Sequence, residues 1–477
     1  MAFDLRRFLP SFSVATALVS LAISGFIHAP AARAQSSDSA PAQAAHSMPA
    51  STSAPHRPNA HDALFHDDGH YVGPGSCSAV ACHGGIEPRS VTRVLQNEYS
   101  TWVTRDKHAR AYTSLTTPLG EQIARTLQLG PAEQAQRCLV CHALDVPAAQ
   151  QARKFDLADG VSCESCHGPA SRWIGPHIQA NAQHAQMVAL GLYDNRNLVL
   201  RTERCLTCHL GAPGLNVDHE LIAAGHPDLR FELDSFTAVE PPHWVEKNAD
   251  GHPLNDPLFG TRAWAIGQAV ELRVSMQRLV RDARSGPWPE FSEMDCISCH
   301  HSLTGPLSWR QRAGYPGHRA GDPPYNFSHY VLCQHIANEV DPTTNTELNQ
   351  AATRVAHLVT SMSTDRPAVI AAAARAAALS ASLANELQTA TYDRARTERL
   401  LRAISADADA ISQDGERTAE QATMTLDALY IADANAGARN PETRAAIDGL
   451  YKLFNNPSAY NAPQFAAQLR RVHQTLP

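Results

Sequence analysis

The stretch VSCESCHGPASRWIGPH, residues 161–177, places two cysteines three positions apart, with a histidine directly after the second. Zinc, an iron–sulfur cluster, a redox dithiol and covalently attached haem all use a Cys-x-x-Cys pair. One such pair does not decide among them. The rest of the chain decides, because the same pattern returns.

The pattern occurs five times and uses ten of the eleven cysteines. We number the sites 1 to 5 in chain order: CSAVACH (Cys77, Cys82, His83), CLVCH (Cys138, Cys141, His142), CESCH (Cys163, Cys166, His167), CLTCH (Cys205, Cys208, His209) and CISCH (Cys296, Cys299, His300). Site 1 has four residues between its cysteines, whereas the other sites have two.

A histidine after every cysteine pair is the attachment signature of c-type haem. Each thiol adds to one haem vinyl group to form a thioether, and the next residue then lies under the iron as its proximal ligand. Structural zinc usually needs two cysteine pairs, and a redox dithiol needs one. Disulfides at this spacing are poor and leave the histidines unexplained. We therefore predict five haem c groups, held by the ten cysteines, with the five motif histidines as proximal ligands.

Cys333 is the cysteine that the motifs do not use. A free cysteine usually behaves as a small buried apolar residue, and we favour that interpretation. An intermolecular disulfide and a reactive thiol are the alternatives.

Composition changes along the chain predict four segments. Arg6 and Arg7 precede a short apolar run, and ARA at 32–34 is a typical cleavage pattern, so the N-terminus reads as an export signal. The following Ser-, Ala- and Pro-rich residues cannot bury enough apolar surface to fold. The segments are a signal peptide (1–34), a disordered tether (35–60), a pentahaem cytochrome c domain (61–344) and a C-terminal helical bundle (345–477).

The predicted fold class is mainly α. The haem domain is rich in Gly and Pro, so we expect a loop-rich unit organised around its covalent haems. After residue 345, apolar residues repeat at helical spacing and helix-start signals recur. Asp365 precedes Pro367, and Asn440 precedes Pro441, as helix caps do. We interpret this part as an antiparallel bundle that packs against the haem domain or supports oligomerisation.

The charge pattern limits the partners. The net charge is −7 without a block of like charges, which argues against binding to nucleic acid or an anionic membrane surface. No long apolar run follows the signal, so we expect no transmembrane span after cleavage. The predicted location is the periplasm or another exported compartment.

Several blocks of sequence resemble multihaem cytochromes c of the cytochrome c554 type, which includes the tetrahaem carrier paired with hydroxylamine oxidoreductase. These blocks are GVSCESCHGPASRWIGPH, STWVTRDKHARAYTSL, ERCLTCHLG and HELIAAGHPDLRFEL, and the resemblance spans about residues 71–310. TRAWAIGQAV, CHHSLTGPLSW and AEQATMTLDALY resemble a larger branch of exported multihaem proteins with a helical C-terminal part.

The resemblance implies which histidines bind the second axial position of the irons. The implied distal ligands are His108, His177, His219, His226 and, next to a motif histidine, His301; further candidates are His70, His243, His329 and His335. The chain departs from the tetrahaem pattern in its fifth site, its long spacer at site 1 and its C-terminal extension. The resemblance therefore leaves open which histidines share an iron.

An iron with two imidazole ligands exchanges electrons but has no position for a substrate. The leading prediction is a pentahaem carrier that relays electrons between other redox proteins and has no catalytic residue. One alternative is a reductase or oxidase of small nitrogen or sulfur species with one open haem. Pentahaem nitrite reductases have a similar haem count, but their CxxCK motif is absent here. The other alternative is a subunit of a larger membrane-associated or filamentous assembly, with the tether and the helical bundle as docking parts. Separately, the C-terminal helices offer a surface for a homo-oligomer.

Overall fold

The computed structural model describes residues 69–90, 92, 94–247, 254–286, 288–296, 299–300, 323–455 and 460–477. The predicted signal peptide, the predicted tether and His301 lie outside these residues. Within the described ranges the regular elements are helices, and pairing of extended segments is limited to isolated bridges. The prediction of a mainly α fold is confirmed.

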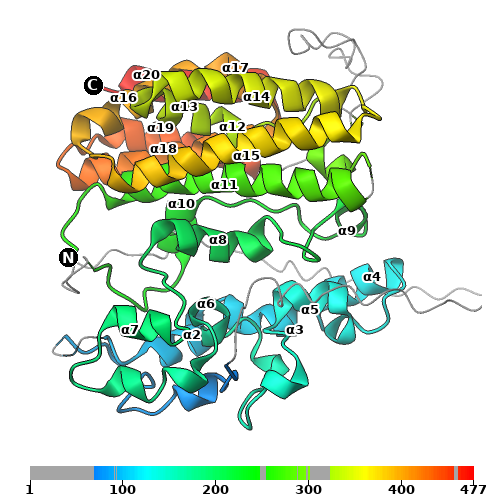
Figure 1. Cartoon of the computed structure of the whole chain (residues 1–477). Helices are drawn as coiled ribbons and strands as arrows, with labels where there is room; N and C mark the ends of the chain where they lie inside the picture. The colour runs from blue at the N-terminus through cyan, green and yellow to red at the C-terminus, as the bar shows by residue number, and fades with distance from the viewer. Residues whose placement is uncertain are drawn as a thin grey trace, which may run out of the picture. The chain divides into compact units, whose positions relative to one another are not determined.

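The first part of the described chain consists of short helices joined by long loops (Figure 1). Its α-helices are α2 (Glu98–Arg105), α3 (Ala111–Ser114), α4 (Pro118–Thr126), α5 (Gln136–His142), α6 (Cys163–His167), α7 (His184–Ala189), α8 (Leu198–His209), α9 (His219–Ala223) and α10 (Leu233–Val239). Short 3-10 helices lie between them, including one at His108–Arg110 and one at Pro176–Ile178.

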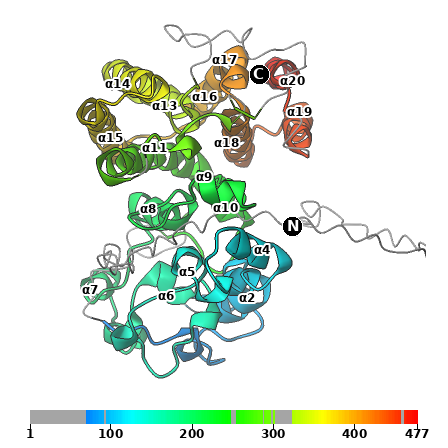
Figure 2. The same ribbon diagram turned by 90° about the vertical axis from the view of Figure 1, so that its right-hand side faces the viewer.

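The second part has much longer helices. They are α11 (Phe259–Ser285), α12 (Ser328–Val331), α13 (Cys333–Val340), α14 (Pro342–Thr360), α15 (Arg366–Thr389), α16 (Arg394–Ala406), α17 (Ala408–Gln413), α18 (Glu416–Asn435), α19 (Pro441–Tyr451) and α20 (Ala462–Thr475). In Figure 2, α13, α14 and α15 form one group and α17 to α20 form another, and α11 contacts both groups through α15 and α18.

The sequence signals at two helix starts are confirmed. The Asp365 side chain accepts a hydrogen bond from the backbone N–H of Ala368 at 3.0 Å, with Pro367 in the first turn. Asn440 accepts from the N–H of Glu442 at 2.9 Å, with Pro441 at the first helical position. Each side chain satisfies a backbone donor that the helix leaves unpaired, and each proline sits where no N–H is needed.

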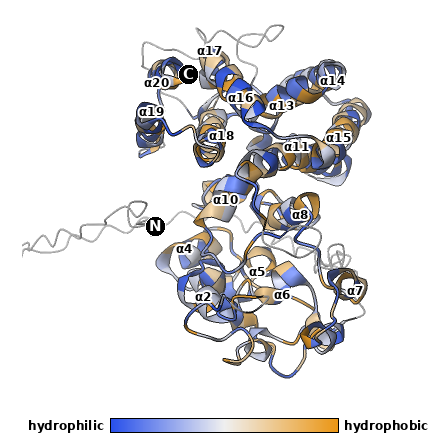
Figure 3. Cartoon of the chain, turned by 90° about the vertical axis from the view of Figure 1, so that its left-hand side faces the viewer, coloured by the Kyte–Doolittle hydropathy of each residue, from blue (hydrophilic) through white to orange (hydrophobic). Residues whose placement is uncertain are grey.

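A single large apolar core joins the long helices. It includes fully buried residues of α11, α15 and α20, such as Trp264, Leu383 and Phe465. Figure 3 shows that the long helices carry both apolar and polar residues around their circumference, as helices that bury one side do. Helix α15 is apolar and long enough to cross a membrane; 44% of its most apolar window is buried, and these residues belong to this core.

Helix α8 brings the haem motifs to this core. It packs against α11, and Leu206, between the two cysteines of site 4, is fully buried in the same cluster. Helix α11 lies within the predicted haem domain by sequence, yet it packs most closely with α15. The boundary predicted at residue 344 stays a prediction.

Candidate haem-binding sites

Helices position the cysteines and histidine of three sites, and a single helical turn positions those of a fourth. Site 2 ends α5, site 3 forms α6, and site 4 ends α8. At site 5 the backbone N–H groups of Cys299 and His300 both donate to the Cys296 carbonyl, as in a helical turn. Residues at i, i+3 and i+4 share one face of a helix, so each such motif presents two thiols and an imidazole in the same direction.

Site 1 reaches a similar result with a loop. The Cys82 N–H donates to Ala79, and the His83 N–H donates to the Cys77 carbonyl at 3.2 Å. The two additional residues thus form a turn between the thiols, and Val80 within it is exposed. None of the eleven cysteines, all of which are described, forms a disulfide.

Four motif histidines face four of the histidines that the resemblance implied. The ring centroids of His83 and His177 are 6.2 Å apart and their planes are nearly parallel, with an angle of 12°. The other pairs are His142 with His226 at 6.2 Å, His209 with His108 at 6.3 Å, and His300 with His219 at 6.3 Å. We call these four contacts the imidazole pairs.

The separation within the imidazole pairs fits one metal ion between two rings. A metal–imidazole bond is about 2.0 Å, and the ring centre lies about 1.1 Å behind the nitrogen, so two coaxial ligands place their ring centres about 6.2 Å apart. Direct packing of two rings allows shorter distances, down to about 4.5 Å. The donor set and its spacing therefore fit haem iron.

Hydrogen bonds orient the rings for this role. In five of the paired histidines Nδ1 is engaged: His83 with Glu98 at 2.9 Å, His108 with Asp106 at 3.1 Å, His142 with the Ala111 carbonyl at 3.0 Å, His177 with the Ile174 carbonyl at 2.5 Å and His226 with the Pro227 carbonyl at 2.8 Å. A bond at Nδ1 fixes the ring and leaves Nε2 as the nitrogen for a metal, which is the usual arrangement of metal-binding histidines.

Burial keeps two motif imidazoles neutral. It lowers the pKa of His167 to about 4 and the pKa of His209 to about 4, because a charged ring loses its hydration. A histidine must be neutral to bind a metal ion. Both rings are therefore ready to act as ligands at neutral pH.

Site 3 differs from the others, since His167 has no imidazole partner among the described residues. One candidate is His243, whose charge, after burial, contributes most to the lowered pKa of His167. The Nδ1 atom of His243 bonds the Pro241 carbonyl at 2.9 Å, and its ring packs against Trp244. His243 therefore has the orientation of a metal ligand, without the close pairing seen at the other sites.

The remaining candidate histidines lie elsewhere. His329 bonds Glu271 at 2.9 Å, and His335 lies 3.1 Å from Asp407, both among the long helices. The backbone of His70 bonds Ser171. Cys333 is fully buried, as the interpretation as a small buried residue predicts, and burial raises its pKa to about 12.

The sites are close to one another. The thiols of Cys77 in site 1 and Cys163 in site 3 are close enough to interact, and so are those of Cys141 in site 2 and Cys208 in site 4. The charges of site 3 and site 4 also interact, through Cys166. Sites 1, 3, 4 and 2 therefore form a continuous series.

Sequence reasoning missed the carboxylates around the sites. Glu164, between the cysteines of site 3, is 1% exposed and accepts three backbone hydrogen bonds, from Val72 at 2.9 Å, Gly73 at 2.8 Å and Ala170 at 2.7 Å. It thereby ties the loop before site 1 to site 3. The only sign of this role in the sequence is that Glu164, a charged residue, lies inside a motif that a haem would cover.

The comparisons agree with this geometry. Residues 77–168, which contain sites 1 to 3, match the family model described as cytochrome c554 and c-prime. This match supports a cytochrome c of the c554 type over the matched residues. A c554-type segment implies haem c as cofactor, haem-based electron transfer as function and redox proteins as partners. No curated protein and no solved structure matches the chain.

Proposed function

We propose that this chain is an exported pentahaem cytochrome c that relays electrons between redox proteins. The observation that carries the proposal is the set of four imidazole pairs at 6.2–6.3 Å. Each pair joins a motif histidine to a histidine from another part of the chain. Local packing does not require that combination four times, whereas a shared metal ion does.

The roles of the residues follow from this arrangement. The ten motif cysteines hold the haems as thioethers, and the motif histidines are the proximal ligands. His177, His226, His108 and His219 are the distal ligands at sites 1, 2, 4 and 5. Bound haem supplies a one-electron couple between ferric and ferrous iron. The chain supplies the spacing, the ligands and the local charge that set the potentials.

The contacts between sites support the order 1–3–4–2–5 for the relay. The thiol contacts join site 1 to site 3 and site 4 to site 2. Site 5 joins the series at site 2. Arg137, directly before Cys138, forms an ion pair with Asp218 at 2.6 Å, and Asp218 directly precedes His219. Sites 1 and 5 are then the ends at which partner proteins would exchange electrons.

Site 3 supports a second candidate function. Because His167 lacks an imidazole partner among the described residues, its iron would be open if His243 does not bind it. An open iron in the middle of the relay could bind a small nitrogen or sulfur species, which would make the protein a reductase or oxidase. Electron paramagnetic resonance of the oxidised protein separates the two functions. Wholly low-spin iron favours the carrier. A high-spin component that stays the same size in His243→Ala favours the enzyme, because His243 then does not bind the iron of site 3.

Replacing distal histidines one at a time tests the ligand assignment. His177→Ala should keep five covalent haems and turn one iron high-spin, so that it binds carbon monoxide when reduced. His184→Ala is the matched control, because His184 bonds Asp194 at 2.8 Å and faces no histidine. An unchanged low-spin spectrum for His177→Ala, His226→Ala and His108→Ala would refute the proposed ligation.

Intact-mass analysis tests the stoichiometry and the export. We expect a mature chain that begins after Ala34 and carries five haem groups. Four groups would remove site 1, whose spacing departs from the other motifs. A chain that keeps residues 1–34 would contradict the cleaved signal.

A further inference from the structure

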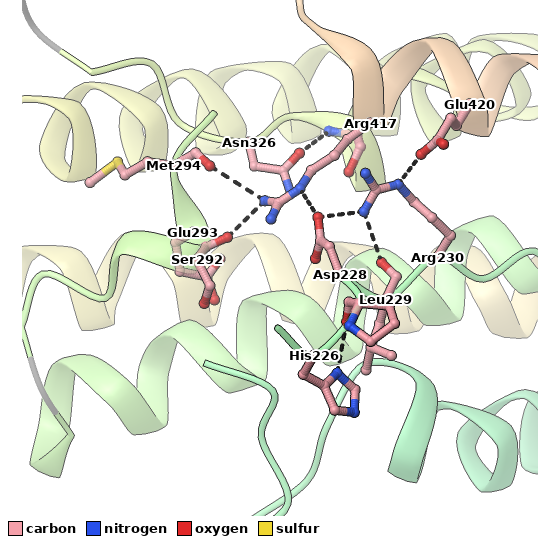
Figure 4. A network of polar contacts seen from close by, with 12 residues as sticks. His226, Asp228, Leu229, Arg230, Ser292, Glu293, Met294, Asn326, Arg417 and Glu420 are labelled. Carbon is pink, nitrogen blue, oxygen red and sulfur yellow. Dashed lines mark hydrogen bonds and ion pairs between the residues drawn. The ribbon is translucent and has the colours of Figure 1, made fainter. Parts of the chain in front are cut away.

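A half-buried network of charged side chains lies between sites 2 and 5 (Figure 4). Its centre is Asp228, two residues after His226. The Asp228 carboxylate accepts from Nε of Arg417 at 2.6 Å and from Nη1 of Arg230 at 2.5 Å. Arg230 also bonds Glu420 through Nε. Two arginines from distant parts of the chain thus share one carboxylate.

Arg417 extends this network to site 5. It lies in the first turn of α18, and only 8% of it is exposed. Its Nη1 donates to the Ser292 carbonyl at 2.7 Å and more weakly to the Met294 carbonyl at 3.4 Å. These carbonyls lie four and two residues before Cys296. One guanidinium therefore holds the segment after His226 and the segment before site 5, as Figure 4 shows.

The same guanidinium places a positive charge beside site 5. Its hydrogen bonds to the carbonyls of Ser292 and Met294 hold it next to the segment that leads into Cys296. A cation in this position, little exposed to solvent, stabilises an added electron on the haem that Cys296 would hold, because opposite charges attract more strongly away from water.

A purely structural link between these segments would not need charges. Replacing a buried ion network by apolar residues of similar volume is often neutral or stabilising. The arginine fork does have a geometric advantage, since it can bond a carboxylate and two carbonyls at once. The network is therefore suited both to fix the junction and to adjust its potential.

We propose that Arg417 is a positioning residue that fixes the junction of sites 2 and 5 and raises the reduction potential of site 5. The proposal rests on the proposed function, because it takes His300 and His219 as ligands of site 5. It also assigns the C-terminal region a role in the relay: α18 supplies the charge that makes site 5 the electron-accepting end of the series.

The test measures the five midpoint potentials of the haem-loaded protein by spectroelectrochemistry. His219→Met identifies site 5, because a Met ligand raises the potential of a haem. Arg417→Met should lower that same potential by about 59 mV. For a one-electron couple this corresponds to about a tenfold decrease in the ratio of reduced to oxidised iron. Glu420→Gln, which removes a negative charge, should shift it in the opposite direction and by less.

Arg417→Lys separates charge from geometry. Lysine keeps the charge but lacks the fork, so we expect the melting temperature to fall as in Arg417→Met while the site 5 potential stays near that of the parent. Arg375→Met is the matched control, since Arg375 pairs with Glu347 on the surface of the long helices and should change no potential.

The outcomes distinguish the two proposals. If His219→Met shifts no potential, the ligation of site 5 in the proposed function fails. If His219→Met shifts one potential and Arg417→Met leaves it in place, Arg417 is merely structural and this inference fails. If Arg417→Met does not fold, the test uses the other two variants. Glu420→Gln should raise the site 5 potential, and Arg417→Lys should leave it near that of the parent. A Glu420→Gln protein with an unchanged site 5 potential overturns the proposal.

Discussion

The two regions of this chain are stabilised in different ways. The motif region, residues 69–247, has α-helices of 4 to 12 residues, whereas the helical region, residues 254–477, includes α11 with 27 and α15 with 24. Apolar clusters confined to the motif region contain three to five buried residues each, while one large cluster runs through the long helices.

The difference shows where the cofactors replace side-chain packing. Small apolar clusters cannot offset the entropy lost when a long loop-rich segment is ordered. In the motif region the cysteines and histidines of the sites are mostly half-buried, so the bound haems would cover them and complete the core. The helical region has its own core, and two sites adjoin it: α8, which carries site 4, packs against α11, and site 5 lies between α11 and α12 in the sequence.

The largest expected effect comes from withholding haem. Protein made without the haem-attachment machinery should lose backbone protection across the motif region, while α14 to α20 stay protected. Hydrogen exchange read by mass spectrometry checks this region by region. A protease-resistant, protected motif region without haem would break the comparison.

A core substitution should affect the helical region strongly. Phe465 in α20 is fully buried and packs against the rings of Phe454 and Tyr460. Phe465→Ala should reduce the free energy of unfolding of that region by about 3–5 kcal/mol, because it removes apolar contacts and leaves a cavity. Ile431→Ala, at an exposed position, is the control and should cost far less. Chemical denaturation followed by circular dichroism measures both.

A buried carboxyl should make the helical region less stable as the pH rises. Burial raises the pKa of Asp414 to about 7, and the nearby Asp295 adds to the shift although Thr418 donates a hydrogen bond that opposes it. The folded state then binds the proton more tightly than the unfolded state, whose pKa is about 3.9. Stability from this group is complete below about pH 4 and is lost as the pH rises to about 7.

The size of this loss is about 4 kcal/mol once the pH is well above 7. Asp414→Asn should remove that part of the pH dependence, and Asp409→Asn, at an exposed carboxyl, should not. The measurement is the free energy of unfolding of the haem-loaded protein at several values between pH 4 and 8. Equal pH profiles for the parent and Asp414→Asn would mean that Asp414 is charged when buried.

The smallest expected effect concerns a helix start. Asn440 caps α19 and also donates from Nδ2 to the Thr475 carbonyl at 2.7 Å, at the end of α20. Asn440→Ala should lower the free energy of unfolding by about 1–2 kcal/mol. Asn385→Ala, on the exposed side of α15, should be neutral. Equal effects of the two substitutions would show that the cap contributes nothing here.

Features that depend only on neighbouring residues could be predicted from the sequence. A cysteine pair followed by histidine presents its three side chains on one turn, so the motifs could be read without knowing the fold. The same holds for the caps at Asp365 and Asn440, because an N-cap acts on backbone groups two or three residues away. The mainly α class followed from the helical periodicity of the C-terminal part.

Only the tertiary structure decided which of these elements meet. His177 follows the site 3 motif by ten residues, yet it faces His83 of site 1. Arg417 reaches Asp228 across 189 positions of the chain. Such contacts depend on how loops close and helices pack, and no spacing in the sequence specifies them. The chain alone determined what each site is made of, and long-range packing determined which histidines face each other and which charges surround them.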